Sequence, residues 1–590
     1  MLGPCWLGLL ASQLAWAGGD PRQVMVVANG DDVDSMAVAQ YYAESRQLPE
    51  GRICALSGIS PETTSLSLAD YEGLVVPAID ACLAALPDPA AIQMLVTTRG
   101  LPYRVDLEGA YVVGFEAMLQ VHRTESRTDG SLLAGQPQTD LGGYYAASVF
   151  NPVFIGGGYA TSDCDFTLSS DYAGAYNTSC LLLQSGRLPD AFDRHEITVR
   201  GTWDFGSNLF IVTRLDGFSA DDALDLVDRA VAGDGSFPEA PLMCMHGADS
   251  ARGARDPECE LVVRMLDTAG LPAAWIDTFD SELSGQEVAG YLTGSAAMTG
   301  AIAGNSYVPG AIADNITSYG AVPQNFFCDA AGEVCPASES QTSVARFVRA
   351  GATGVHGTVA EPLNNVFPNA SLYLLYSFGY SLGESFLLSS RHIYWQNLVL
   401  GDPLATPYAT RPTVTVAVGE VPADGVLTVQ ASHPDGVAEL AVYMDDLELA
   451  AGLGDAVEVP AAALGVEGDS VELYLLATAQ RTTVERSGWP VEEWTAGADV
   501  RGWAWQTVQI TAARGDGGDG GDGGDGGDGE DDTAAPDRDA GELDESVPES
   551  RERGASEGAG SKSGGCSVGG SSAGALGWLA IFLTLVRRRS

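Results

Sequence analysis

The sequence predicts an α/β fold, in which helices cover both faces of a mostly parallel sheet, followed by an all-β sandwich and a disordered stalk. Up to about residue 408, short apolar runs alternate with segments of helical periodicity, which is typical of strands joined by helices. From residue 411, short alternating strands follow one another between Gly, Pro and Asp turns. Beyond residue 515, Gly, Asp, Glu and Ser dominate, and too few apolar residues remain to build a core.

The first predicted strand, residues 23–28 (QVMVVA), is apolar after Gln23 and rich in valine, as expected of a strand that is buried on both faces. Ser219 is a good N-cap for a helix at 220–232. Residues 106–195 are rich in Gly, Tyr, Ser and Asp with weak periodicity, and we interpret them as a long insertion. Further strands are expected at 92–98, 209–213, 241–246, 273–277 and 288–293, and further helices at 35–47, 67–85, 258–269 and 342–350.

Residues 351–407 are expected to close the α/β domain with a buried strand, a loop that carries His356 and Glu361, a long helix, and a second strand that ends before Asp402. Loops that follow buried strands are where α/β domains bind ligands, so these residues are candidates for a site. The alternative is structural: His356 is satisfied within its loop, and Glu361 caps a helix or ties down the loop.

Residues 410–513 contain runs such as TVTVAV and VELYLLATA, whose number and spacing predict an immunoglobulin-like β-sandwich. Residues 515–564 form an acidic Gly/Asp linker in which Asp recurs every third residue. That spacing leaves calcium binding open as an alternative to a plain solvated linker. No other cofactor or metal is predicted.

The formal net charge is −49, which excludes nucleic acid and anionic lipid as partners for the body of the protein. We interpret the charge as a solvated acidic surface suited to an extracellular setting, with divalent-cation binding as the alternative. Residues 1–17 have the features of a signal peptide, because an apolar run at 7–14 precedes the small-residue cleavage pattern Ala15-Trp16-Ala17. The chain is therefore expected to be exported.

Cysteine usage fits export. Of ten cysteines, Cys5 lies in the signal peptide and Cys566 in the tail. The remaining eight are an even number, which predicts disulfides in an oxidising compartment. No C-x-x-C motif or Cys/His cluster indicates zinc. The spacing favours local pairs, although other pairings stay open: Cys54–Cys82, Cys164–Cys180, Cys244–Cys259 and Cys328–Cys335.

The C-terminal residues 565–590 combine small residues around Cys566, an apolar stretch at 573–586 and the basic end Arg587-Arg588-Arg589. The stretch is shorter than the ~20 residues of an ordinary membrane span. The tail resembles the MYXO-CTERM sorting signal of myxobacteria, in which a cysteine precedes the helix. That resemblance implies processing at Cys566 by a sorting protease and anchoring in the cell envelope through the C-terminal helix. A simple membrane tail is the alternative.

Segments of the first 400 or so residues resemble an uncharacterised family of exported bacterial proteins from organisms with exosortase-type sorting systems. These segments are VMVVANGDDVDSMAVAQYYAESRQLP, LVTTRGLPYRV, VPGAIADNITS, GATGVHGTVAEP and YWQNLVLGDPL, in that order. More distantly, the layout and the closing WQNLVLGDPL look like the gingipain-like, caspase-like cysteine peptidases, which also carry an immunoglobulin-like module. The resemblance implies a caspase-like domain over residues 20–408.

Peptidases of that kind need a thiolate beside a histidine base. The resemblance implies a His-Gly pair after one strand and a cysteine after the next. His246-Gly247, at the end of the strand at 241–246, fits the His-Gly pair. Where gingipains carry Gly-His-Gly this chain has Leu292-Thr293-Gly294, and the nucleophile position at 312–318 contains no cysteine. Cys244 lies two residues before His246 and therefore on the same face of the strand.

The catalytic candidates are thus Cys244, His246 and Glu361, with no complete dyad among them. We expect an exported, surface-anchored envelope protein with a non-catalytic caspase-like scaffold; other envelope components as partners are not readable from the sequence. The alternative is a secreted cysteine peptidase of gingipain-like type. A third hypothesis is a hydrolase of another kind that uses acidic loop residues such as Glu361.

Overall fold

The computed structural model describes residues 19–107, 111–123, 149–151, 198–199, 203–204, 209–327, 341–362, 364–480 and 500–513. All of these residues fall within the first of two compact units, which ends at Asp516. The signal peptide, the linker and the tail with Cys566 lie outside the described residues, as do Cys164, Cys180, Cys328 and Cys335. Within the described residues, no helix is long and apolar enough to span a membrane.

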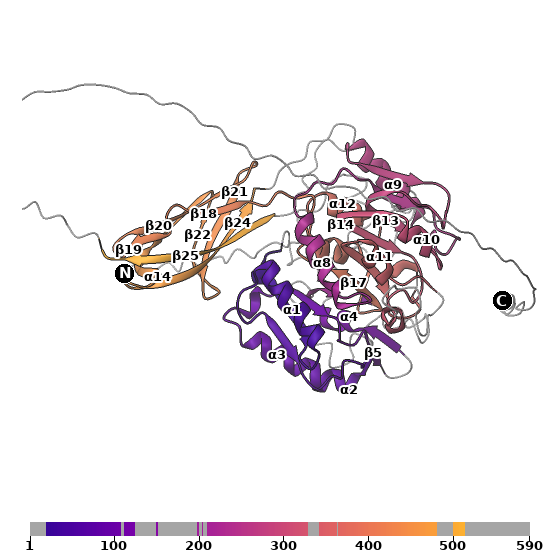
Figure 1. Ribbon diagram of the computed structural model, residues 1–590, viewed down its shortest axis with the longest axis horizontal. Helices are drawn as coiled ribbons and strands as arrows, with labels where there is room; N and C mark the ends of the chain where they lie inside the picture. Colours follow the sequence, from indigo (N-terminus) through magenta and orange to yellow (C-terminus); the bar gives the residue numbers. More distant parts are fainter. Residues whose placement is uncertain are drawn as a thin grey trace, which may run out of the picture. The chain divides into compact units, whose positions relative to one another are not determined.

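A ten-stranded sheet forms the centre of the α/β domain (Figure 1). Its strands follow the order β12-β11-β13-β14-β15-β17-β10-β4-β1-β2. All neighbours pair in parallel except β15 and β17, which are antiparallel, so two parallel runs of opposite direction meet there. The strands are β1 Val24–Asn29, β2 Ile53–Leu56, β4 Met94–Thr98, β10 Ile211–Leu215, β11 Leu242–Met245, β12 Ala273–Ile276, β13 Glu287–Thr293, β14 Ser306–Asn315, β15 Gly354–Thr358 and β17 Asn397–Gly401.

Both faces of this sheet are buried. Along β11, Met243 and Met245 belong to one hydrophobic cluster, whereas Leu242 and Cys244 belong to a second cluster on the opposite face. The α/β prediction is therefore confirmed. The helices that supply these clusters or join the strands are α1 Val33–Arg46, α2 Leu68–Asp70, α3 Val76–Ala84, α4 Phe115–Gln120, α8 Ala220–Gly233, α9 Asp256–Thr268, α10 Thr299–Ala303, α11 Ala345–Ala350, α12 Ser371–Ser377 and α13 Leu382–Ser389.

Local sequence explains where several elements begin. The predicted N-cap Ser219 accepts a hydrogen bond from the backbone of Asp222, whose side chain accepts one from the backbone of Ser219, and this capping box starts α8. All six residues of β1 are buried, as its continuous apolar run predicts. A π-helical turn, Tyr71–Val75, joins α2 to α3 in the single helix predicted at 67–85.

Three predictions about the α/β domain are wrong in detail. The predicted insertion does not begin at residue 106, because α4 and strands β5 (Arg104–Leu107) and β6 (Tyr111–Gly114) pack into the core. His356 lies within β15 and is fully buried, whereas a loop position was expected. The predicted long helix is divided into α12 and α13, because Gly379 adopts a φ of 91° between them and Ser381 caps the second helix.

Short strands pair outside the main sheet. β5 and β6 form a three-stranded sheet with β3 (Ser65–Ser67). Two further pairs are β7 (Val149–Phe150) with β16 (His392–Ile393) and β8 (Thr198–Val199) with β9 (Trp203–Asp204).

From residue 413 the chain forms two β-sheets that share one hydrophobic core, built from residues such as Leu427 on one sheet and Leu475 on the other. The sandwich contacts the α/β domain through Asp446, which accepts hydrogen bonds from Arg22 and Arg52. The first sheet contains β18 Thr413–Val416, β20 Val426–Ser432 and β23 Ala456–Pro460, and the second contains β19 Glu420–Pro422, β21 Val437–Met444, β22 Leu447–Leu453, β24 Ser470–Ala479 and β25 Arg501–Thr511. A short helix, α14 (Ala461–Leu464), follows β23.

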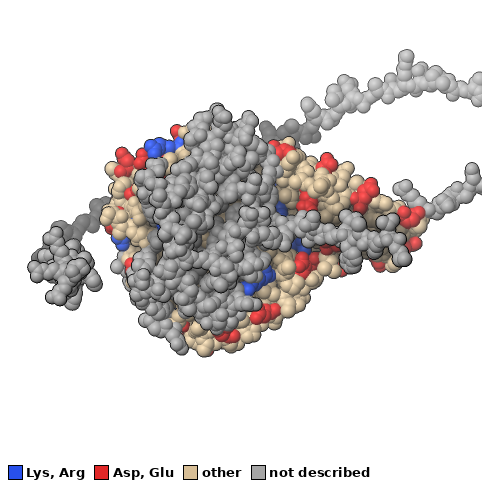
Figure 2. All heavy atoms as spheres, turned by 180° about the vertical axis from the view of Figure 1, so that it is seen from behind, with Lys and Arg blue, Asp and Glu red and all other residues tan. Residues whose placement is uncertain are grey.

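The cysteine predictions have different outcomes. The predicted Cys54–Cys82 disulfide is present. Cys244 and Cys259 are neighbours, as predicted, but both are free thiols, so the predicted disulfide between them is wrong for this structure. Where Figure 2 shows the surface of described residues, acidic side chains lie at several separate places. No group of three His, Cys, Asp or Glu residues that could hold a metal is found in the described part of the chain.

Candidate functional site

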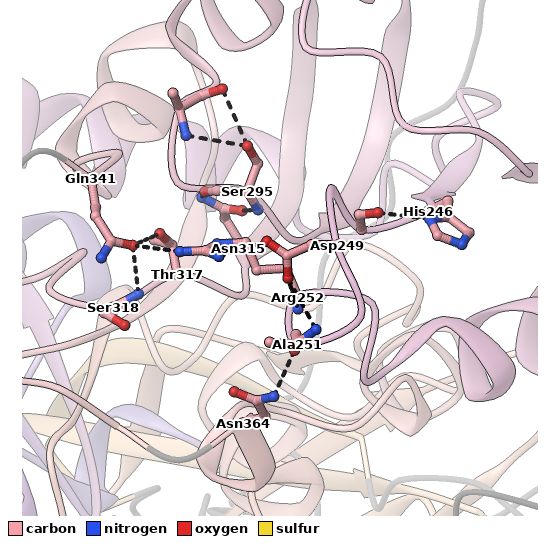
Figure 3. Close-up of polar contacts among 12 residues, drawn as sticks. His246, Asp249, Ala251, Arg252, Ser295, Asn315, Thr317, Ser318, Gln341 and Asn364 are labelled. Atoms are coloured by element: carbon pink, nitrogen blue, oxygen red, sulfur yellow. Dashed lines mark hydrogen bonds and ion pairs between the residues drawn. The ribbon is translucent and has the colours of Figure 1, made fainter. Parts of the chain in front are cut away.

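The carboxyl ends of β11, β13, β14 and β15 meet at one edge of the large sheet, because these strands are parallel. The loops that leave them carry polar side chains that point toward one another in Figure 3. This edge includes the β11–α9 loop, with His246 and Arg252, and the residues that follow β14, including Thr317 and Ser318. Carboxyl ends of strands are where open α/β sheets bind ligands, so we examine this edge as the candidate site.

A buried ionic network lies under the edge. Asp314, the last residue but one of β14, is ion-paired with Arg255, and its Oδ1 lies 2.8 Å from Nδ1 of His356. The second ring nitrogen of His356, Nε2, lies 3.1 Å from Oδ1 of Asn397. Asp314 and His356 are fully buried. The network therefore joins β14, β15 and β17, and Arg255 connects it to the start of α9.

Arg255 holds this network in place through several further contacts. Its Nη1 donates to the carbonyl of Pro368 at 3.0 Å, and its Nη2 donates to the carbonyl of Thr293 at 3.0 Å. Burial is the largest single effect on Arg255 and acts to lower its pKa, but the charge and hydrogen bond of Asp314, together with smaller contributions from Cys259 and Cys244, raise the pKa overall. Arg255 thus stays charged inside the protein and compensates the buried carboxylate.

The outer layer of the edge is tied together by amide side chains. Asn315 accepts from the backbone N–H of Ser295 at 2.7 Å and donates to its carbonyl at 2.9 Å. Oε1 of Gln341 accepts from the Thr317 hydroxyl at 2.5 Å and from the Ser318 N–H at 3.0 Å, and Arg252 donates to the same oxygen at 3.3 Å. These contacts fix the loops after β13 and β14 relative to the β11–α9 loop (Figure 3).

Glu361 lies in the loop after β15, as predicted, and accepts a hydrogen bond of 2.7 Å from the hydroxyl of Ser318. Both side chains are half-buried. The next residue, Tyr319, has a φ of 62°, a left-handed conformation that is unusual for a bulky side chain. Sequence analysis singled out Glu361 but missed its partner, since 43 residues separate the two.

The candidate pair Cys244 and His246 does not form a catalytic dyad. Cys244 is fully buried, and burial, together with a hydrogen bond to the Cys259 thiol, raises its pKa well above the usual value. His246 is 46% exposed, and its Nε2 lies 3.3 Å from Asp256. The prediction that Cys244 and His246 lie on the same side of the strand is correct, because both contact residues of α9. Their partners differ, however: Cys244 contacts Cys259, whereas His246 contacts Asp256. A buried, protonated thiol does not serve as a nucleophile.

A buried carboxylate on the same helix predicts a pH dependence of stability. Burial raises the pKa of Glu258 to about 7, against smaller lowering contributions from Arg391, Ala370 and Asn369. The folded chain therefore keeps a proton that the unfolded chain releases above a pKa of 4.5. We expect the free energy of unfolding to fall as the pH rises through this window, by at most about 3 kcal/mol.

Glu258→Gln is expected to remove this pH dependence of the free energy of unfolding. Urea unfolding below pH 4.5 and above pH 7 measures the difference. Glu260→Gln is the matched control, because Glu260 lies on the same helix with a half-exposed side chain. Equal slopes for the wild type and Glu258→Gln would contradict the assignment.

The similarity of this chain to known proteins is one of fold. No protein-family model matches it, and no curated protein matches it. One similar solved structure is titled "Structure of Protease", with 10% identity and a TM-score of 0.38, covering 83% of this chain and 98% of that chain. The Arg-specific cysteine proteinase gingipain R gives 10% identity and a TM-score of 0.28, with coverage of 76% and 97%. The complex of the Porphyromonas gingivalis RgpB pro- and mature domains gives 11% identity and a TM-score of 0.26, covering 51% of this chain and 77% of that chain. These values describe a distant similarity between folds.

Proposed function

We propose that this chain is an exported, envelope-anchored protein whose α/β domain is a caspase-like scaffold without peptidase activity. The observation that supports this proposal best is the buried network of Arg255, Asp314 and His356. Its Asp314 lies within residues 312–318, where a peptidase of the gingipain-like type would need its nucleophile, and its His356 lies in the neighbouring strand. In this chain an aspartate there is buried and engaged by a guanidinium and an imidazole.

Such a network serves stability. Arg255 donates to Asp314 and to the carbonyls of Pro368 and Thr293, so the two charges compensate each other inside the protein. Cys244, on β11 of this part of the sheet, is buried among apolar side chains. The gingipain-like cysteine peptidase is therefore the less supported alternative for the described residues.

The proposed location rests on the sequence. A signal peptide at 1–17, an acidic linker at 515–564 and a tail with Cys566 indicate export followed by processing and anchoring through the C-terminal helix. A sorting protease is the proposed partner. The β-sandwich, which we assign to an immunoglobulin-like type, would then be the part of the folded chain that directly precedes the stalk.

Mapping the thiols of mature protein from the cell envelope tests the non-peptidase proposal. We expect Cys244 and Cys259 to resist alkylation in the folded chain and to react only after denaturation, because both are buried. The same preparation is expected to leave a peptide library uncleaved. A cysteine that alkylates rapidly at neutral pH, together with cleavage that alkylation abolishes, would overturn the proposal. The C-terminal peptide in the same digest shows whether the chain ends near Cys566.

The Ser318–Glu361 hydrogen bond favours a second candidate function, a hydrolase with a serine nucleophile. In such a reaction Oγ of Ser318 would form a bond to a carbonyl carbon, while its proton passes to Oε1 of Glu361 and then to the leaving group. The pair has the required contact, 2.7 Å, and lies at the carboxyl edge of the sheet. Ser318 is also next to the strained backbone of Tyr319.

A fluorophosphonate probe, which labels activated serines, distinguishes this candidate from the scaffold. The scaffold proposal expects no labelling of Ser318. Labelling that disappears in Ser318→Ala and Glu361→Gln, but persists in Ser295→Ala at the same edge, would establish the hydrolase instead.

A further inference from the structure

A pocket of about 40 Å³ lies between α4, β10, α13 and the strands β16 and β17. Its walls are largely apolar, with Ile211, Phe386 and Val399 among them. Glu116 and Thr213 also line it. At about 10–15 Å³ for each water-sized group, the pocket has room for about three such groups.

Two polar atoms of this pocket have no hydrogen-bond partner within the described chain. Oε1 of Glu116 accepts from Arg214 at 3.0 Å and from Thr97 at 2.8 Å, but Oε2 has no partner. Oγ1 of Thr213 likewise has none. Glu116 is 3% exposed and Thr213 is 1% exposed. Because leaving such groups unsatisfied costs free energy, both atoms are suited to a donor that enters the pocket.

The charges around Glu116 do not balance. The guanidinium of Arg214 is shared between Glu116 and Asp216, which accepts from its Nε at 2.9 Å. The other partners of Asp216 are neutral, namely the Tyr103 hydroxyl and the Gly217 N–H. Burial raises the pKa of Tyr103, and a second cation, Arg99, lies near enough to oppose that rise. However, no ion pair between Arg99 and Glu116 is found among the described residues. One cation therefore serves two buried carboxylates, and an incoming cation would balance the second.

A third acceptor belongs to another residue that lines the same pocket. The hydroxyl of Ser390, which also lines the pocket, donates to the carbonyl of Phe386 at 2.7 Å, so its lone pairs are free to accept. An ammonium group carries three donors, which matches the three acceptors on Glu116, Thr213 and Ser390. The apolar walls suit a short alkyl chain attached to that group.

We propose that this pocket binds a small primary alkylamine, with its ammonium group on Glu116, Thr213 and Ser390 and its alkyl group against the apolar wall. The site differs from the polar edge after β14 and does not depend on whether that edge is catalytic. Asn397, which lines the pocket and contacts His356, connects it to the buried network.

Calorimetric titration of the full mature chain with ethylammonium chloride tests the proposal. We expect ethylammonium to bind and to raise the unfolding temperature, because a ligand that binds only the folded state stabilises it. The neutral compound ethanol, which has the same number of heavy atoms, is expected to do neither. Thr213→Val removes one acceptor without changing the shape of the side chain, and we expect it to weaken ethylammonium binding by about tenfold.

The matched control is Thr293→Val. Thr293 is also a buried threonine whose hydroxyl has no hydrogen-bond partner, but it does not line the pocket. We expect the Thr293→Val variant to bind ethylammonium with the affinity of the wild type. Ser390→Ala provides a second loss of an acceptor if Thr213→Val does not fold. Absence of ethylammonium binding to the folded wild type, equal binding of ethanol, or unchanged affinity in both acceptor variants would overturn the proposal and leave water as the occupant.

Discussion

Replacing Arg255 by Met is expected to lower the free energy of unfolding by about 3–5 kcal/mol, because it leaves the buried carboxylate of Asp314 without its cation. Asp314 is fully buried, and Arg255 is 4% exposed. Methionine approximates the length of the arginine stem, so the loss reflects charge and hydrogen bonds more than an empty space. Urea unfolding followed by tryptophan fluorescence measures the change.

Arg264→Met is the matched control on the same helix. Arg264 pairs with Glu260 at 3.5 Å, but both side chains are about half-exposed or more. An exposed pair of this kind contributes less than about 1 kcal/mol. If Arg255→Met and Arg264→Met destabilise the chain equally, the buried network does not have the structural role assigned to it.

The sequence predicts the elements whose cause is local. The strand β1 is identified by its continuous apolar run, and α8 by the capping residue Ser219 together with its apolar periodicity. The change at residue 411 from alternating strands and helices to strands alone likewise marks the start of the sandwich. These signals lie within a window of a few residues, so one sequence is enough to detect them.

Long strands with irregular composition are harder to predict. β14 extends over ten residues, but Pro309 and Gly310, with a φ of 88°, interrupt its apolar pattern. His356 was expected in the loop after a buried strand, yet it lies within β15 and is buried there. A polar residue inside a strand is stable there only because of partners that the local sequence does not reveal.

The candidate site is predictable in position but not in composition. His246 and Glu361 follow strands and do lie at the carboxyl edge. Their actual partners, Asp256 and Ser318, and the buried pair of Asp314 and Arg255, are brought together by the sheet order. Arg255 is 59 residues from Asp314. A residue 59 positions away cannot be identified as a partner by spacing along one chain.

The same reasoning applies to Asp402, which the sequence analysis proposed as a candidate because it follows the last strand. In the structure Asp402 is fully buried and accepts from Arg46 at 2.5 Å and from the Tyr42 hydroxyl at 2.8 Å. It also accepts from the backbone N–H of Leu404 at 2.9 Å. These contacts join α1 to the end of β17, so we assign Asp402 a structural role.

Arg46→Met is therefore expected to cost about 3–5 kcal/mol in the free energy of unfolding, because Asp402 keeps only its neutral donors. Asp234, which also pairs with Arg46 at 2.6 Å, retains a longer contact of 3.7 Å with Arg411 and is affected less. Glu44→Met, an exposed substitution on the same helix, is the control and should change the stability by less than about 0.5 kcal/mol. Scanning calorimetry on the three proteins measures these differences.

A double-mutant cycle separates the charge from the packing at this position. In Arg46→Met/Asp402→Asn no carboxylate is left facing the lost guanidinium, so we expect the double variant to be more stable than Arg46→Met alone. If the two changes were simply additive, the loss in Arg46→Met would come from packing, and Asp402 would not depend on Arg46 for its charge balance. If the double variant regains part of the free energy of unfolding that Arg46→Met loses, most of that loss comes from the uncompensated charge of Asp402. A buried aspartate at the end of a strand is then structural because a cation compensates it.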